Sequence, residues 1–137
     1  MRLSESGTVV GPIWLRAKEA PEIVFPEAGW SDFPIVILGW WPGEVENLLR
    51  GAAVDANCLF MDGPFQFSLN RSGEVHFREH RMSGMVVAVG PTLRISAEEF
   101  WGALHISASD VVAECDARGW SNADIDTLRR VIAKAGH

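Results

Sequence analysis

Residues 60–81 read FMDGPFQFSLNRSGEVHFREHR, and this stretch decides the fold that the sequence predicts. Its centre, Asn70-Arg71-Ser72-Gly73, suits a type I turn in which Gly73 supplies the left-handed residue of a bulge. The turn fixes the register of the two flanking strands, because strand side chains alternate between faces. One face then carries the pairs Leu69–Val75 and Phe67–Phe77, and the other carries Asn70–Glu74, Ser68–His76 and Gln66–Arg78. We therefore predict an antiparallel hairpin with one face on the core and one face in water.

Short apolar runs on both sides of this hairpin extend the predicted sheet into a meander. They end at Gly and Pro, which break strands or mark edges and bulges. The expected strands are residues 8–17, interrupted at Gly11-Pro12, and residues 22–25, 56–61, 85–89 and 92–95. Asp62-Gly63-Pro64 is expected to form a tight turn or a bulge before the hairpin.

The mid-chain stretch 35–51, IVILGWWPGEVENLLRG, has two interpretations. Three of the four residues Ile35–Leu38 are β-branched, which favours a strand there and a short helix that begins near Pro42 and ends at Gly51. The alternative is one helix from Pro34, capped by Asp32 and kinked at Pro42. We prefer the strand followed by the helix.

Two helices are predicted after the sheet. Ser96 and Glu99 form the pattern of a capping box, and Gly119 suits the left-handed end of the helix that begins there. A last helix spans residues 123–134, with Ser121 or Asn122 as its cap. The expected fold is therefore α+β: an antiparallel meander packed against two C-terminal helices and one short mid-chain helix.

Composition indicates one globular domain over residues 1–137. The chain is 47% apolar, and its two cysteines do not form a disulfide framework, so both are expected to be buried thiols. The longest apolar run, residues 35–41, is too short to cross a membrane, and the N-terminus lacks the pattern of a secretory signal. We expect a cytoplasmic protein.

The net charge of −6 is concentrated at the two ends of the chain. Residues 1–56 carry four basic and eight acidic side chains, residues 57–95 carry four and three, and residues 96–137 carry four and seven. No stretch combines clustered arginine with aromatic residues, so nucleic-acid binding is not expected. The acidic surface suits a basic partner or serves solubility alone.

The sequence contains no recognisable catalytic or cofactor motif. His76 and His80 lie roughly 13 Å apart if both are on one strand, which argues against a shared metal. The glycines do not have the spacing of a phosphate-binding loop, and no serine sits in a nucleophile elbow. We expect no cofactor, no metal and no enzymatic activity.

Tryptophan is unusually frequent, with six Trp and no Tyr in the chain. Trp40 and Trp41 are adjacent, so their side chains cannot point the same way in a helix or a strand. Either both rings are buried between sheet and helix, or one is exposed and is a candidate anchor for a protein partner.

Three segments carry a resemblance to a known class of proteins: FPIVILGWW at 33–41, FMDGPFQFSLNRSG at 60–73 and CDARGWSNADIDTLRRVIA at 115–133. Together they resemble small bacterial proteins that are encoded beside polymorphic toxins as their immunity partners. The resemblance implies a cytosolic α+β protein that binds a cognate toxin domain and blocks its active site, without catalysis of its own.

The polar hairpin face and its surroundings supply the residues that we expect to touch such a partner: Trp41, Asp62, Glu74, His76 and Arg78. The toxin would be a basic nuclease or a nucleotide-directed enzyme. The alternative function is a small hydrolase or metal-dependent enzyme that uses His76, Glu79 and His80, and a third is an accessory subunit of a permanent oligomer.

Overall fold

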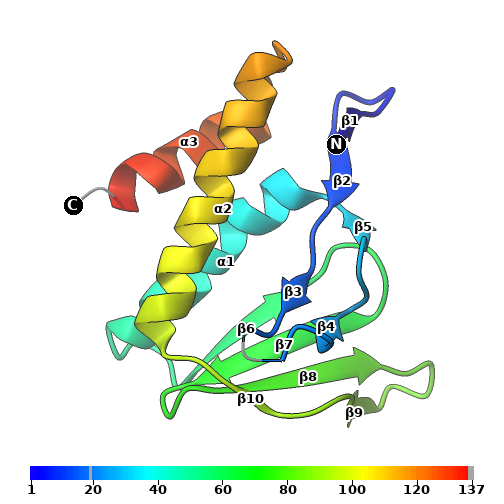
Figure 1. Ribbon diagram of the computed structural model, residues 1–137, viewed down its shortest axis with the longest axis vertical. Coiled ribbons are helices and arrows are strands. Elements are labelled where there is room, and N and C mark those ends of the chain that lie inside the picture. The colour runs from blue at the N-terminus through cyan, green and yellow to red at the C-terminus, as the bar shows by residue number, and fades with distance from the viewer. Residues whose placement is uncertain (19, 136–137) are drawn as a thin grey trace.

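The computed structural model describes residues 1–18 and 20–135, and it confirms the α+β fold. The three helices gather on one side of the main sheet, and the short N-terminal strands lie at one end of it (Figure 1). In chain order the elements are β1 (Arg2–Leu3), β2 (Val9–Pro12), β3 (Leu15–Arg16), β4 (Val24–Phe25), β5 (Ser31–Asp32), α1 (Pro34–Leu49), β6 (Asp55–Leu59), β7 (Phe65–Asn70), β8 (Glu74–His80), β9 (Val86–Ala88), β10 (Leu93–Arg94), α2 (Ala97–Ala117) and α3 (Ala123–Ala135).

The main sheet is antiparallel and has the strand order β10-β8-β7-β6, with β9 also paired to β8. The predicted register of the hairpin is confirmed, since Phe67 lies opposite Phe77 and Leu69 lies opposite Val75. Gly73 has a φ of +83°, and its N–H donates to the Asn70 carbonyl at 3.1 Å. The turn chemistry therefore sets which side chains face the core.

The inner face of the sheet is covered in two parts. Phe67 is fully buried, and its ring makes edge contacts with Trp41 of α1 and Phe100 of α2, with centroids 4.9 and 5.5 Å apart. The N-terminal segment covers the rest, because the ring of Phe25 stacks on Phe77 with a centroid distance of 4.4 Å. Helices and N-terminal segment thus share one hydrophobic core.

The preferred interpretation of residues 35–51 is wrong. Residues Pro34–Leu49 form one helix of 16 residues that contains Pro42, so the mid-chain helix is not short and Ile35–Leu38 is not a strand. This helix contacts α2, α3, β2 and β6, and these neighbours cover the broad side of α1 that carries its buried residues: Pro34, Ile35, Ile37, Leu38, Trp41, Pro42, Val45 and Leu48. A short continuous run of apolar residues is compatible with a buried helix and with a buried strand, so the pattern alone does not distinguish the two. Here the packing around α1 outweighs the preference of isoleucine and valine for strands.

The start of α1 also differs from the alternative that we considered. The N-cap position is Phe33, whose side chain makes no capping hydrogen bond, and Pro34 occupies the first turn. Proline suits that position because the first N–H groups of a helix have no intrahelical acceptor. Asp32 does not cap α1; it is buried, and its carboxylate accepts hydrogen bonds from the Trp30 indole and from the N–H groups of Phe33 and Asp62.

Both C-terminal helices begin as predicted. The Ser96 hydroxyl accepts a hydrogen bond from the Glu99 N–H at 3.1 Å, and the Asn122 side-chain oxygen accepts one from the Ile125 N–H at 2.8 Å. Gly119 has a φ of +71°, as expected where α2 ends. The Asn122 amide also donates to the Gly7 carbonyl at 3.0 Å, which ties the start of α3 to the N-terminal segment.

Among the described residues, no helix combines the length and the apolar character that crossing a membrane requires.

Candidate functional site

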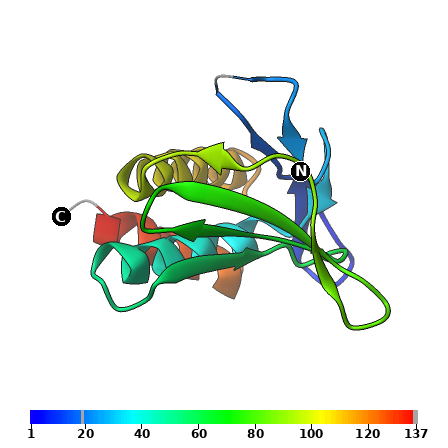
Figure 2. The same ribbon diagram turned by 90° about the horizontal axis from the view of Figure 1, so that it is seen from below.

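The outer face of the main sheet lies away from the helices. Figure 2 shows the sheet in front with the helices behind it. We call this surface the open face, and the strand registers assign to it Asp55, Asn57, Leu59, Gln66, Ser68, Asn70, Glu74, His76, Arg78, His80, Val86, Ala88 and Arg94. All except Ser68 are exposed or half-buried. The predicted division of the hairpin into a core face and a solvent face is confirmed.

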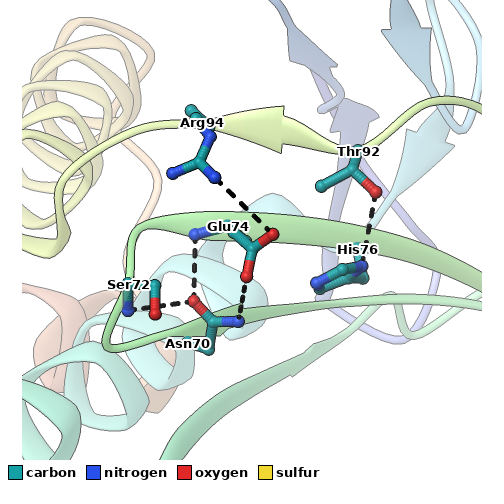
Figure 3. Close-up of polar contacts among 6 residues, drawn as sticks. All are labelled: Asn70, Ser72, Glu74, His76, Thr92 and Arg94. Carbon is teal, nitrogen blue, oxygen red and sulfur yellow. Dashed lines mark hydrogen bonds and ion pairs between the residues drawn. The ribbon is translucent and has the colours of Figure 1, made fainter.

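One end of the open face, beside the hairpin turn, is polar and tightly hydrogen-bonded (Figure 3). The Asn70 side-chain oxygen accepts from the N–H groups of Ser72 and Glu74, each at 3.0 Å, and its amide donates to the Glu74 carboxylate at 3.1 Å. That carboxylate lies 3.9 Å from the Arg94 guanidinium. The polar side chains here are thus held in place before any partner arrives.

His76 occupies the middle of the open face. Its ring nitrogen Nδ1 lies 3.5 Å from the Thr92 hydroxyl oxygen, and Figure 3 shows the two side chains directed toward each other. Ser68, opposite His76 on β7, is only 6% exposed. The centre of the face therefore offers an imidazole beside an exposed arginine, Arg78, one alternation further along β8.

The other end of the open face combines His80, which is hydrogen-bonded to Gln66, with exposed apolar side chains on the strands and turns around it. Five of the ten large apolar side chains that are exposed in the described chain lie on the open face, in the β6–β7 loop or in the β8–β9 turn: Leu59, Met61, Met82, Met85 and Val86. The turn is closed by a hydrogen bond from the Arg81 N–H to the Met85 carbonyl at 2.7 Å. Clustered exposed apolar residues mark interaction surfaces, and methionine adapts its shape to different partners.

The structure brings together three of the five residues that the sequence assigned to partner binding. Glu74, His76 and Arg78 alternate along β8 and share the open face. Asp62 is exposed in the turn after β6, where its N–H donates to the Asp32 carboxylate at 3.1 Å.

Trp41 corrects the sequence-based assignment. It is 1% exposed, and its indole N–H donates to the Leu59 carbonyl at 2.9 Å. The exposed member of the pair is Trp40, which is 40% exposed. Trp41 therefore presents no surface to a partner, because α1 is a helix whose inward side contains position 41 and not position 40.

The residues of the alternative enzyme are not brought together. His76 and His80 are on the open face, whereas strand alternation places Glu79 on the inner face. There Glu79 lines a cavity of about 220 Å³ with Phe25 and Phe65, and its carboxylate lies 3.4 Å from the Arg81 guanidinium. The described part of the chain contains no group of three His, Cys, Asp or Glu side chains that could hold a metal ion.

Sequence reasoning missed the exposed apolar side chains around this end of the open face. Their signal was present, since Met82 and Met85 flank Ser83-Gly84 in a turn, where polar residues are the rule. It also missed that Asp32 is a buried hydrogen-bond acceptor for three groups, because the three donors come together only in the folded chain.

Both cysteines are buried thiols, as expected. Burial raises the pKa of the Cys58 thiol, and the negative charge of Glu44 on α1 raises this pKa further. Glu44 is therefore near β6.

Comparison of the chain with protein-family models, with curated proteins and with solved structures found no match.

Proposed function

We propose that this protein is an immunity-type inhibitor that binds a cognate bacterial toxin domain through the open face and blocks the active site of that toxin. It acts in the cytoplasm, and it has no catalytic activity of its own. The observation that carries the proposal is the open face itself, which combines a fixed polar end with exposed apolar side chains around its other end.

The dimensions of the open face suit a protein partner. Four strand positions at a spacing of about 4.8 Å, and up to seven residues at about 3.3 Å each, give a surface of roughly 20 by 20 Å. A standard interface buries about 800 Å² on each partner, so the face supplies about half of that area and a partner of standard size also contacts its borders, such as the β8–β9 turn. A rigid sheet also loses little conformational entropy on binding.

The chemistry of the face also suits protein recognition. Protein–protein interfaces combine apolar contact area with direct hydrogen bonds. Met82 and Met85 supply the apolar contact, while Glu74, His76 and Arg78 supply directional hydrogen bonds and charge. The net charge of −6 favours encounter with a basic toxin domain, as expected for a nuclease.

Co-expression with the product of the adjacent open reading frame tests the proposal. We expect a stable complex and protection of the host cell from that product. Absence of both a complex and protection would contradict the proposal.

Matched variants locate the binding surface. Arg78→Glu, in the middle of the open face, is expected to raise the dissociation constant at least about tenfold, and Met82→Asp is expected to act in the same direction. Arg130→Glu makes the same charge change on α3, on the helix side of the molecule, and is expected to leave binding unchanged. Equal weakening by Arg78→Glu and Arg130→Glu, in calorimetric titrations, would show that the open face is not the binding surface.

A further inference from the structure

β6 is the border strand of the main sheet, because the strand order ends there (Figure 2). The Phe60 N–H donates to the Phe65 carbonyl at 3.1 Å. Hydrogen-bonded pairs alternate in an antiparallel ladder, so Ala56 and Cys58 bond to β7 in the same way. The backbone N–H and C=O groups of Asp55, Asn57 and Leu59 therefore point away from β7, toward the free edge.

This free edge carries little protection. In the part of the chain that the structure describes, one group on it has a recorded intramolecular partner: the Leu59 carbonyl, which accepts from the Trp41 indole at 2.9 Å. Natural edge strands are usually guarded by lysine, proline, a bulge or a covering element. The sequence of β6, Asp-Ala-Asn-Cys-Leu, contains neither lysine nor proline, and Asn57 at its centre is exposed.

We propose that β6 pairs with β6 of a second copy of the chain. The two strands run antiparallel about a two-fold axis at Asn57 and join the two sheets into one. The N–H of Asn57 in each copy donates to the Asn57 carbonyl of the other. The Leu59 N–H donates to the Asp55 carbonyl across the axis.

The side chains favour this pairing with a second copy. About the axis at Asn57, Asp55 lies opposite Leu59 and Ala56 lies opposite Cys58, so no like charges face each other within the strands. The inner-face residues Ala56 and Cys58 are fully buried in the core of each chain, so the side chains that meet at the junction are those of Asp55, Asn57 and Leu59.

Charge complementarity extends beyond the strands. Antiparallel pairing places the end of β6 that leads to Asp62 in one copy beside the end that follows Ala53 in the other. The guanidinium of Arg71 lies there, donating to the carbonyls of Gly51 and Ala53 at 3.1 and 3.0 Å. An acidic side chain of one copy and a basic side chain of the other therefore lie at each end of the proposed junction.

The exposed tryptophan of α1 lies on the same border of the molecule. The Trp41 indole N–H donates to the Leu59 carbonyl on the free edge, and Trp40 is the residue before Trp41 in α1. The neighbouring copy would cover part of this ring, which is 40% exposed in the single chain.

Sedimentation velocity over a wide range of protein concentration measures the association. We expect the mass of two chains at high concentration. Asn57→Pro removes an N–H that points away from β7, so it leaves the intramolecular ladder intact while it blocks strand pairing. This variant is expected to stay monomeric, whereas the control Asn57→Ala, which keeps the N–H, still associates.

A second variant and a second measurement do not depend on the proline. Asp62→Arg alters only an exposed side chain and is expected to weaken association at least about tenfold, because it places like charges at both ends of the junction. Hydrogen exchange at the Asn57 and Leu59 amides is expected to be slow in the associated protein and fast on dilution. A wild-type protein that is monomeric at every concentration, or that associates while the Asn57 amide still exchanges rapidly, would overturn the proposal. Neither result bears on toxin binding by the open face.

Discussion

Asp32 shows how one buried carboxylate holds separate parts of the chain together. It is 1% exposed, and it accepts hydrogen bonds from the Trp30 indole at 2.9 Å, the Phe33 N–H at 2.7 Å and the Asp62 N–H at 3.1 Å. The last of these joins β5 to the turn after β6. Three donors directed at one side chain satisfy the hydrogen-bonding capacity that burial would otherwise leave unmet.

Replacing this acceptor is therefore costly. In Asp32→Asn, one oxygen becomes an amide that faces existing donors, so at least one N–H loses its partner. We expect the free energy of unfolding to fall by about 2 kcal/mol, measured by urea denaturation. The exposed control Asp110→Asn is expected to change it by less than about 0.5 kcal/mol. Equal effects of the two substitutions would mean that the Asp32 contacts do not contribute to stability.

For single residues, the sequence predicts the exposed face correctly where the alternation of side chains along a strand decides it. It placed Glu74, His76 and Arg78 on one face because each is two residues from the next. It could not decide between Trp40 and Trp41, because the inward side of α1 depends on β6, α2 and α3, which are distant in sequence. The role of Asp32 was equally hidden, since Asp62 is thirty residues away.

Among the elements, the β7–β8 hairpin depends on a glycine that has two roles. Gly73 has a φ of +83°, and a Cβ at this position would lie 2.9 Å from the Ile95 carbonyl oxygen. The Gly73 carbonyl in turn accepts the Ile95 N–H at 2.8 Å. The turn therefore sets the register of β8 with β7 and also the approach of β10.

Gly84 provides a matched control for this turn. It has a φ of +84°, but a Cβ there would meet no atom within 4 Å. Gly84→Ala is expected to cost about 1 kcal/mol, the penalty of a left-handed conformation. Gly73→Ala adds a steric clash with backbone and is expected to cost at least about 1 kcal/mol more, measured as the difference in free energy of unfolding. Equal costs would show that β10 moves away from the turn without loss.

The hairpin and α1 illustrate what local sequence determines at the level of elements. A turn is specified by four adjacent residues, so Asn70–Gly73 was predictable with its register. Residues 35–38 favour a strand by propensity, yet they form the first turn of α1 because the sheet and the other two helices bury one broad side of that helix. The stabilisation that α1 gains from this burial depends on residues far away in the chain. The sequence of residues 35–38 itself therefore contains no pattern that indicates a helix.

For the whole molecule, the N-terminal segment and the helices cover parts of the same sheet face. Phe25 is 5% exposed and contacts Phe60, Phe65 and Phe77, the last by stacking. The α+β class was predictable because strands precede the two long helices, but the return of residues 24–25 to the sheet was not. Phe25 and Phe77 are separated in the sequence by α1, β6 and β7. No periodic pattern of apolar residues indicates that two such distant side chains are in contact.

Phe25→Ala tests whether these parts form one cooperative unit. We expect a loss of about 3 to 4 kcal/mol in the free energy of unfolding, because the substitution leaves a cavity among aromatic rings. Far-UV circular dichroism and tryptophan fluorescence are expected to report the same denaturation midpoint, in the variant and in the wild type. Separate midpoints for the two signals would indicate that the N-terminal segment unfolds independently, contrary to the single domain predicted from the sequence.

The hydrogen bond between the Asn122 amide and the Gly7 carbonyl has a consequence for biosynthesis. A ribosome makes Gly7 early, but its partner is made more than a hundred residues later, at the start of α3. Phe25 likewise leaves the ribosome long before Phe77 is added. The segment around Gly7 therefore has no completed packing surface until α3 has been made, and we expect the native structure to form only after the residues of α3 have left the ribosome.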